Sequence, residues 1–308
     1  MVYFNNQLIF PEPYRVPSYF ISPFSTDRLR ELEQIVSKRK IDNESELLDQ
    51  KFGNHEFLMS AKDAIFRALS FYNLHNEDEV YIVTTSRNKY VSSCVTSQID
   101  RCCKWTREIS DRTKLIFVIH EFGTLCNVEE LSKFNIPIIE DFAMSMFSQV
   151  SSKKSDLSDF KIYSLPKFFP VQFGGVLCYG NNKFQTKKIE NLLDFQKYLQ
   201  KISTHYLLQE NFIISKRKEN YSYYKEKLTE LNLKCRFELS EYETPSVFMF
   251  TSKNIDLDGL KIFCQSHGIE CSKFYGESSF FLPVHQYLDE FDINYIVNLI
   301  KYFINENE

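Results

Sequence analysis

The chain has 308 residues, of which 43% are hydrophobic and 25% are charged, as expected of a soluble globular protein with one sizeable core and about two domains. Its net charge of −4 argues against nucleic acid or anionic membranes as partners. The absence of a basic-then-apolar leader, of any apolar run near ~18 residues and of metal-binding cysteine spacing predicts a cytoplasmic protein with no membrane span and no metal site.

The first part of the chain is expected to hold an extended arm and two capped helices. Residues 1–24 carry prolines between aromatic residues, which favours an arm that packs on another surface, such as a second subunit. Ser25 precedes a helix expected to run to about Lys38. Ser60 precedes another helical pattern and has Asp63 three positions on, the spacing of a capping box. A serine at a helix N-terminus is a natural phosphate seat, although most such serines bind nothing.

Strands and helices then alternate in the pattern of a mostly parallel, doubly wound α/β sheet. The expected strands are 78–83, 114–119 and 136–139, and the expected helices are 90–99 and 128–134. The strand at 114–119 is a continuous apolar run, which suits a parallel strand covered on both faces. Ligands bind at the carboxyl ends of the strands in such a sheet.

The segment Ile136–Tyr179 carries the residues with the most specific chemistry. It is interpreted as a buried strand ending at Glu140–Asp141, a linker, a strand that presents Lys167, and the pair Gly174–Gly175 before an antiparallel partner strand. An acid and a lysine at neighbouring strand ends are what pyridoxal 5'-phosphate (PLP) chemistry requires, because the acid pairs with the pyridinium nitrogen and the lysine forms the Schiff base. The ordinary alternatives are that Asp141 caps the next helix and that Lys167 lies at the surface.

The rest of the chain is predicted to form a smaller α+β unit. A long helical region from about 182 to 231 leads into it. Strands at 246–250 and 280–282 alternate with helices at 257–267 and 292–304. We therefore expect a large domain with an N-terminal arm over residues 1–200 and a small C-terminal domain over residues 201–308.

The order and rough spacing of these segments resemble the DegT/StrS-type sugar aminotransferases from about Thr26 to the C-terminus. The resemblance implies a fold-type-I PLP enzyme that transfers an amino group from glutamate or glutamine to a keto-sugar attached to a nucleotide. It implies a role in amino-sugar or surface-glycan biosynthesis and a homodimer with its site at the subunit interface. The segments that carry the resemblance are Ser60-Ala61, Asp78-Glu79-Val80, Lys114-Leu115-Ile116, His120-Glu121-Phe122-Gly123, Ile136 to Asp141, Ser164-x-x-Lys167, Gly174-Gly175 and Phe281-Leu282-Pro283-Val284-His285.

Carried over position by position, the resemblance implies that Lys167 is the Schiff-base lysine and proton shuttle and that Asp141 is the pyridinium partner. The chemistry agrees, because a cationic pyridinium needs a carboxylate that stays ionised and a proton-accepting lysine must be neutral. His120 is interpreted as a structural histidine close to the chemistry. The resemblance also implies cofactor contacts from Ser60, Ala61 and Ser164 at the phosphate, from Tyr90 at the ring and from Met144 near the phenolic oxygen.

Two departures from the family pattern keep other functions open. Met144 stands where the family usually has Gln or His, and it cannot donate a hydrogen bond. Ser164 and Lys167 are three residues apart where the family usually has five. The alternatives are a PLP enzyme of another reaction type on a small amino acid, and a non-catalytic relative on the same scaffold.

Overall fold

The computed structural model of the chain describes residues 2–4, 7–9, 12, 16–37, 44–149, 157–180, 184 and 193–307. They divide into two compact units, Phe24–Glu210 and a second unit that combines Met1–Pro23 with Asn211–Glu308. Part of the predicted N-terminal arm lies outside the described residues. None of the helices within the described ranges combines the length and apolar character needed to cross a bilayer.

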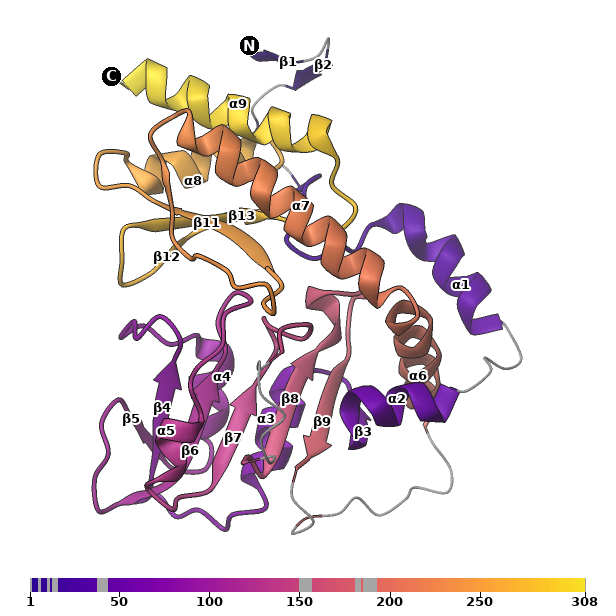
Figure 1. Cartoon of the computed structure of the whole chain (residues 1–308), viewed down its shortest axis with the longest axis vertical. Helices are drawn as coiled ribbons and strands as arrows, with labels where there is room; N and C mark the ends of the chain where they lie inside the picture. Colours follow the sequence, from indigo (N-terminus) through magenta and orange to yellow (C-terminus); the bar gives the residue numbers. More distant parts are fainter. Residues whose placement is uncertain are drawn as a thin grey trace. The chain divides into compact units, whose positions relative to one another are not determined.

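The unit Phe24–Glu210 is built on a sheet of seven strands (Figure 1). In chain order they are β3 (Asn54–Leu58), β4 (Glu79–Thr84), β5 (Lys104–Thr106), β6 (Thr113–Ile119), β7 (Ile138–Asp141), β8 (Phe160–Ser164) and β9 (Gly175–Tyr179). Across the sheet the order is β3-β9-β8-β7-β6-β4-β5. The strands from β8 to β5 run parallel, and β9 is antiparallel to β8 and to β3. The predicted mostly parallel sheet is confirmed, as is the antiparallel partner of β8.

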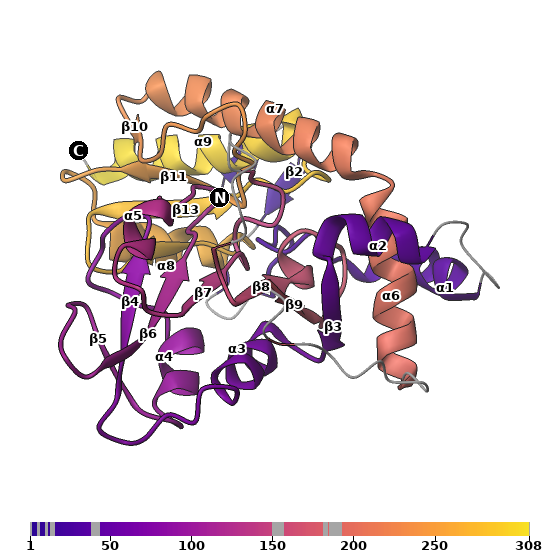
Figure 2. The same ribbon diagram turned by 60° about the horizontal axis from the view of Figure 1, so that its bottom comes forward.

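Both faces of this sheet are covered. Alternate residues of β6 point to opposite sides of the sheet, so its neighbouring residues belong to different buried clusters. Leu115 and Phe117 join a buried cluster with α3 (Ala61–Leu69) and α4 (Ser93–Ile99), which lie on the same face in Figure 2. Ile116 and Val118 belong to a separate cluster that includes Leu131 of α5 (Glu129–Ser132). The continuous apolar run of this strand therefore reflects burial on both faces, and the doubly wound α/β class is confirmed.

Further helices pack beside β3 at the antiparallel side of the sheet. They are η1 (Thr26–Arg28), α1 (Leu29–Ser37), α2 (Glu44–Phe52) and α6 (Asp194–Leu207). Ser25 caps η1 by accepting a hydrogen bond from the Asp27 amide, so the predicted helix start is confirmed. Lys51 Nζ of α2 lies 3.0 Å from Oε1 of Glu210, the last residue of this unit.

The second unit contains a four-stranded antiparallel sheet and three helices around their own core. Its sheet has the order β10 (Lys234–Cys235), β11 (Val247–Thr251), β13 (Ser279–Pro283) and β12 (Ser272–Phe274), and its helices are α7 (Glu210–Thr229), α8 (Leu257–Ser266) and α9 (Glu290–Asn307). The N-terminal segment adds the hairpin of β1 (Val2–Phe4) and β2 (Gln7–Ile9). Tyr19 ties this segment to the unit through a parallel bridge to Ile269 and a stacked contact with Tyr295.

Two predicted helix boundaries differ from the structure. Part of the helical region expected over residues 182–231 lies outside the described residues, and its described part from residue 193 onward is divided into two helices, since α6 ends at Leu207 and α7 begins at Glu210. The helix expected from Tyr90 begins at Ser93, because Ser92 provides the N-cap by accepting a hydrogen bond from the Cys94 amide. The division of the chain at residue 200 stays a prediction.

Candidate active site

Three polar residues of the predicted site region lie at the carboxyl edge of the parallel strands. Asp141 is the last residue of β7, Ser164 is the last residue of β8, and His120 directly follows β6. These strands are parallel neighbours, so their carboxyl ends share one edge of the sheet. Asp141 pairs with Ile162 of β8, two residues before Ser164. The structure therefore brings Asp141 and Ser164 to adjacent strand ends.

The N-terminus of α3 carries the predicted serine cap. Ser60 Oγ accepts a hydrogen bond from the Asp63 amide at 3.2 Å and donates one to Asp63 Oδ2 at 2.8 Å. The Asp63 carboxylate thus accepts its hydrogen bond from the Ser60 hydroxyl, whereas in a full capping box it would accept one from the Ser60 amide. Within the described part of the chain, the amides of Ala61 and Lys62 donate to no other group. These two N–H groups at the positive end of a helix fit an anionic ligand.

Gly175 holds β9 against this helix start. It pairs with Ser164 on one side and with β3 on the other. A Cβ atom at Gly175 would stand 2.3 Å from the Ser60 carbonyl oxygen and 2.6 Å from the Ala61 nitrogen, and both are backbone atoms that cannot rotate away. Only glycine permits this approach. It gathers Ser60, Ala61 and Ser164, the three predicted phosphate contacts, around a single residue.

The Asp141 carboxyl group is 5% exposed and uses one oxygen within its own turn. Oδ1 accepts a hydrogen bond from the Ala143 amide at 2.8 Å. Among the described residues, no group donates to Oδ2. Burial raises the pKa of this carboxyl to about 6, although the Ala143 hydrogen bond opposes the rise. Near neutral pH the group is therefore mainly ionised, with one oxygen free to receive a cationic N–H.

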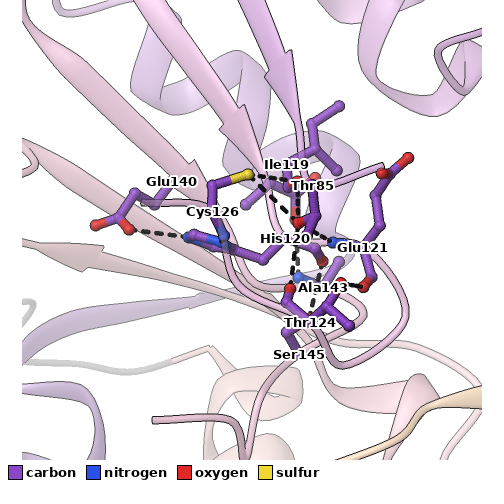
Figure 3. Close-up of polar contacts among 10 residues, drawn as sticks. Thr85, Ile119, His120, Glu121, Thr124, Cys126, Glu140, Ala143 and Ser145 are labelled. Atoms are coloured by element: carbon purple, nitrogen blue, oxygen red, sulfur yellow. Dashed lines mark hydrogen bonds and ion pairs between the residues drawn. The ribbon is translucent and has the colours of Figure 1, made fainter. Parts of the chain in front are cut away.

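His120 is 1% exposed and both of its ring nitrogens are hydrogen-bonded (Figure 3). Nε2 lies 2.9 Å from Glu140 Oε2, and Nδ1 accepts a hydrogen bond from the Cys126 amide at 3.0 Å. Burial lowers the pKa of the imidazole, but the Cys126 side chain and the Glu140 carboxylate outweigh it and raise the pKa to about 9. The hydrogen-bond geometry nevertheless opposes a second ring proton, because the Cys126 N–H points at Nδ1. The Cys126 amide hydrogen already occupies Nδ1, so the ring carries its proton on Nε2 and donates it to Glu140. The interpretation of His120 as a satisfied buried histidine fits this arrangement.

The loops that follow β4, β6 and β7 are joined by polar contacts at the same edge (Figure 3). Thr85 Oγ1 accepts a hydrogen bond from the Glu121 amide at 3.2 Å, and Glu121 Oε2 accepts one from the Ser86 amide at 2.7 Å. Ser145 Oγ donates to the His120 carbonyl oxygen at 2.9 Å. Buried polar groups that are satisfied in this way rigidify the structure around them. The edge that bears Asp141 is therefore fixed by side chains from three loops.

The predicted strand that carries Lys167 is wrong in its length. β8 ends at Ser164, and Lys167 is the last residue of the 3-10 turn η2 (Leu165–Lys167). Pro166 has no amide hydrogen to continue the strand ladder, which explains why the strand stops there. The amides of the two residues after Lys167 donate to the Leu165 carbonyl oxygen and close the turn. Lys167 is thus presented by a short turn, and it is half-buried.

Tyr90 and Met144 lie in two different loops. Tyr90 belongs to the connection between β4 and α4 and is 43% exposed. Its amide donates to Asn88 Oδ1 at 3.0 Å. Met144 is half-buried in the turn after Asp141. Met144 lies three residues after Asp141, whereas Tyr90 follows β4, which is separated from β7 by β6.

Arg107 is a residue of this region that sequence reasoning missed. Its guanidinium donates to the carbonyl oxygens of Ile82 at 2.7 Å and Asn88 at 2.8 Å, and to Thr84 Oγ1 at 2.9 Å. It therefore fastens the end of β4 to the loop that carries Tyr90. No local pattern marks an arginine after a short edge strand, so only the fold reveals the contact.

The residues present fit PLP at two points. The free amides of Ala61 and Lys62, with Gly175 packed against them, suit a phosphate group. The ionised Asp141 carboxyl, with Oδ2 free of hydrogen bonds from the described residues, suits a pyridinium nitrogen. The two points lie along one edge of the sheet, at the ends of the neighbouring strands β7, β8 and β9.

Comparison with known proteins assigns the chain to a class. A family model described as "Putative PLP-dependent aminotransferase" matches residues 49–242, which is more than half of the chain. None of the curated proteins compared with the chain gives a significant match.

Solved structures similar to this fold include two aminotransferases and a dehydratase that contains PLP. The aminotransferase TlmJ from Streptoalloteichus hindustanus has a TM-score of 0.73 and 15% identity, over 96% of this chain and 100% of its own. A DegT DnrJ EryC1 StrS aminotransferase from Brucella abortus has a TM-score of 0.69 and 17% identity, over 91% and 97%. The GDP-4-keto-6-deoxy-D-mannose-3-dehydratase of E. coli with bound hydrated PLP has a TM-score of 0.67 and 15% identity, over 92% and 100%. The predicted resemblance and the fold-type-I fold are confirmed.

Proposed function

Because the chain belongs to a family of PLP-dependent aminotransferases, we propose that it transfers an amino group from glutamate to a nucleotide-linked keto-sugar. The observation that carries the proposal is the approach of Gly175 to the Ser60–Ala61 backbone, on a strand that only β8 separates from the Asp141 strand. It supports a phosphate seat and a ring-nitrogen partner on one sheet edge. The GDP-4-keto-6-deoxy-D-mannose-3-dehydratase, whose name gives a nucleotide-linked keto-sugar, supports the substrate class. A role in amino-sugar or surface-glycan synthesis follows from that class.

Asp141 and Lys167 have the central roles in this proposal. Bound PLP acts as the electron sink for the amino-group transfer. Asp141 holds a negative charge at Oδ2 for the pyridinium nitrogen, and its burial keeps water from weakening that pair. Lys167 binds the cofactor covalently and, once released, carries the proton from the donor carbon. The η2 turn supports this role because it presents the lysine just beyond the Ser164 strand end.

The remaining predicted residues surround the cofactor in this proposal. Ser60, Ala61 and Ser164 contact its phosphate. Tyr90, in the loop that Arg107 fastens, stacks on its ring. Met144 gives the phenolic side an apolar neighbour that donates no hydrogen bond.

Spectroscopy of the purified protein with PLP tests the proposal. The visible band of a lysine-bound cofactor should form in the wild type and be lost in Lys167→Ala. Lys133→Ala is the matched control, because Lys133 is an exposed lysine of the same unit and its variant should keep the band. A wild-type protein that gives no band with PLP would refute the proposal.

The substrate and the assembly need separate measurements. With ¹⁵N-glutamate and a panel of nucleotide-linked keto-sugars, the label should appear in the sugar product. Sedimentation should give a homodimer, because the family resemblance implies a site completed at the subunit interface. A product that gains no label, or a protein that remains a monomer when active, would contradict these parts of the proposal.

A second candidate is PLP-dependent removal of a hydroxyl group from a keto-sugar. The E. coli dehydratase shares the fold, and Met144 departs from the usual aminotransferase residue. The labelling experiment separates the two reactions, because dehydration yields a deoxy-sugar without ¹⁵N.

A further inference from the structure

Within this proposed function, we infer that His120 is a positioning residue for Asp141. In this inference, Glu140 and Cys126 lock the His120 ring, and the ring holds the Asp141–Ala143 turn in the shape in which the Ala143 amide donates to Asp141 Oδ1. It rests on the proposed role of Asp141 and assigns no step of the reaction to His120.

The first observation is that His120 contacts the Asp141 segment through its backbone and its ring. The His120 amide donates to the Asp141 carbonyl oxygen at 3.0 Å. Its ring packs on the Phe142 ring with 4.1 Å between centroids, and Phe142 in turn stacks on Tyr163 at 5.4 Å. This row of rings crosses the ends of β6, β7 and β8. Phe142 lies between Asp141 and Ala143, so fixing its side chain fixes the turn on which the Asp141 hydrogen bond depends.

The second observation is that the His120 ring cannot rotate without losing a buried hydrogen bond. Glu140 Oε2 binds one nitrogen and the Cys126 amide binds the other. Burial raises the pKa of Glu140, but the hydrogen bond from His120 lowers it overall, so the acceptor is a carboxylate. A flipped or tilted ring would leave a buried charge or amide unsatisfied, which is costly.

The third observation concerns what opposes protonation of Asp141. The Ala143 amide lowers the pKa of its carboxyl by donating a hydrogen bond to Oδ1, and that bond depends on the shape of the turn that the ring holds. The titratable and charged groups around the ring are Glu140 and Asp141 on β7, Cys126 after β6, and Lys161 on β8, which faces Glu140. Removal of the ring should loosen the turn, weaken the Ala143 hydrogen bond and raise the pKa of the Asp141 carboxyl.

The decisive measurement is the titration of Asp141 in the ligand-free protein. Protein labelled with ¹³C at the aspartate side-chain carboxyl is followed by NMR against pH, and the Asp141 signal is identified by its absence in Asp141→Asn. The wild-type midpoint should lie near pH 6. In His120→Gln it should rise by about one pH unit or more, the shift expected when a hydrogen bond to a charged group is lost.

His267→Gln is the matched control. His267 is also a buried histidine, with its ring 4.3 Å from that of Phe263, but it belongs to the second unit. Its variant should leave the Asp141 midpoint unchanged. An unchanged midpoint in His120→Gln, or an equal rise in both variants, would overturn the inference.

Variants of Glu140 keep the inference testable if His120→Gln does not fold. Glu140→Leu removes the acceptor for Nε2–H and should raise the Asp141 midpoint. Glu140→Gln retains an acceptor oxygen and should not raise it, because positioning needs the hydrogen bond rather than the charge. A rise of the same size in Glu140→Gln, or no rise in Glu140→Leu, contradicts positioning through the locked ring.

PLP affinity supplies a second readout that separates this inference from the proposed function. His120→Gln should weaken PLP binding several-fold more at pH 6 than at pH 8, because only at the lower pH does the raised midpoint protonate Asp141. Equal weakening at both pH values indicates a general structural effect and overturns the inference. A wild type that binds no PLP refutes the proposed function instead, whatever the midpoint of Asp141.

Discussion

Replacement of Gly175 by alanine tests whether the contact between β9 and α3 forms the phosphate site. The added methyl carbon would lie 2.3, 2.4 and 2.6 Å from three backbone atoms of Ser60 and Ala61. Ordinary contacts of a carbon atom are about 3.5–4.0 Å, so the two segments must separate by roughly 1 Å or more. Overpacking of this kind costs ~1–3 kcal/mol, and we expect the upper part of that range because no side chain can rotate away.

The assay pairs urea unfolding of ligand-free Gly175→Ala with PLP titration under conditions where the variant is folded. The affinity for PLP should fall about tenfold or more, the equivalent of losing ~1.4 kcal/mol of binding free energy. Gly53→Ala is the control, because Gly53 has φ +62° and no atom within 4 Å of the added carbon. It should lose ~1–2 kcal/mol of stability from its left-handed backbone and retain PLP affinity. A Gly175→Ala protein that binds PLP like the wild type would refute the assignment.

Three further predictions concern the cap, the buried acid and the missed arginine. Ser60→Ala should cost ~1 kcal/mol of unfolding free energy through loss of the N-cap and should weaken PLP binding, whereas an unaltered PLP affinity would exclude Ser60 from the site. Asp141→Asn should stabilise the ligand-free protein more at pH 7 than at pH 4, by ~2 kcal/mol in urea unfolding, because a folded pKa of about 6 exceeds the unfolded value of ~3.9 and stability is lost as pH rises between them. No difference between the two pH values would mean that folding does not raise the pKa of the carboxyl. Arg107→Ala should leave the carbonyl oxygens of Ile82 and Asn88 without their donor and increase amide exchange in the loop of Tyr90, and unchanged exchange would contradict the anchoring role.

The sequence predicts the features that depend on local chemistry, and it misses those set by distant segments. The cap at Ser60 and the apolar strand β6 follow from neighbouring residues, and both are confirmed. The strand expected to carry Lys167 stops three residues early, although Pro166 offered a local signal for that stop. The anchoring of Tyr90 by Arg107 and the pairing of Tyr19 with Ile269 join segments far apart in the chain, so no periodicity indicates them.

The two halves of the proposed cofactor site consist of different chemical groups, backbone amides in one and a side chain in the other. This difference explains how a divergent sequence can keep such a site. The phosphate half consists of backbone amides at the start of α3 and needs only a residue without a side chain at Gly175. The ring-nitrogen half needs one particular side chain, Asp141, and the buried contacts that surround it. Backbone donors tolerate substitution of the residues that carry them, whereas a buried carboxylate tolerates little change in its neighbours. Variation should therefore be concentrated on the α3 side of the site, and the His120–Glu140 side should accept few substitutions.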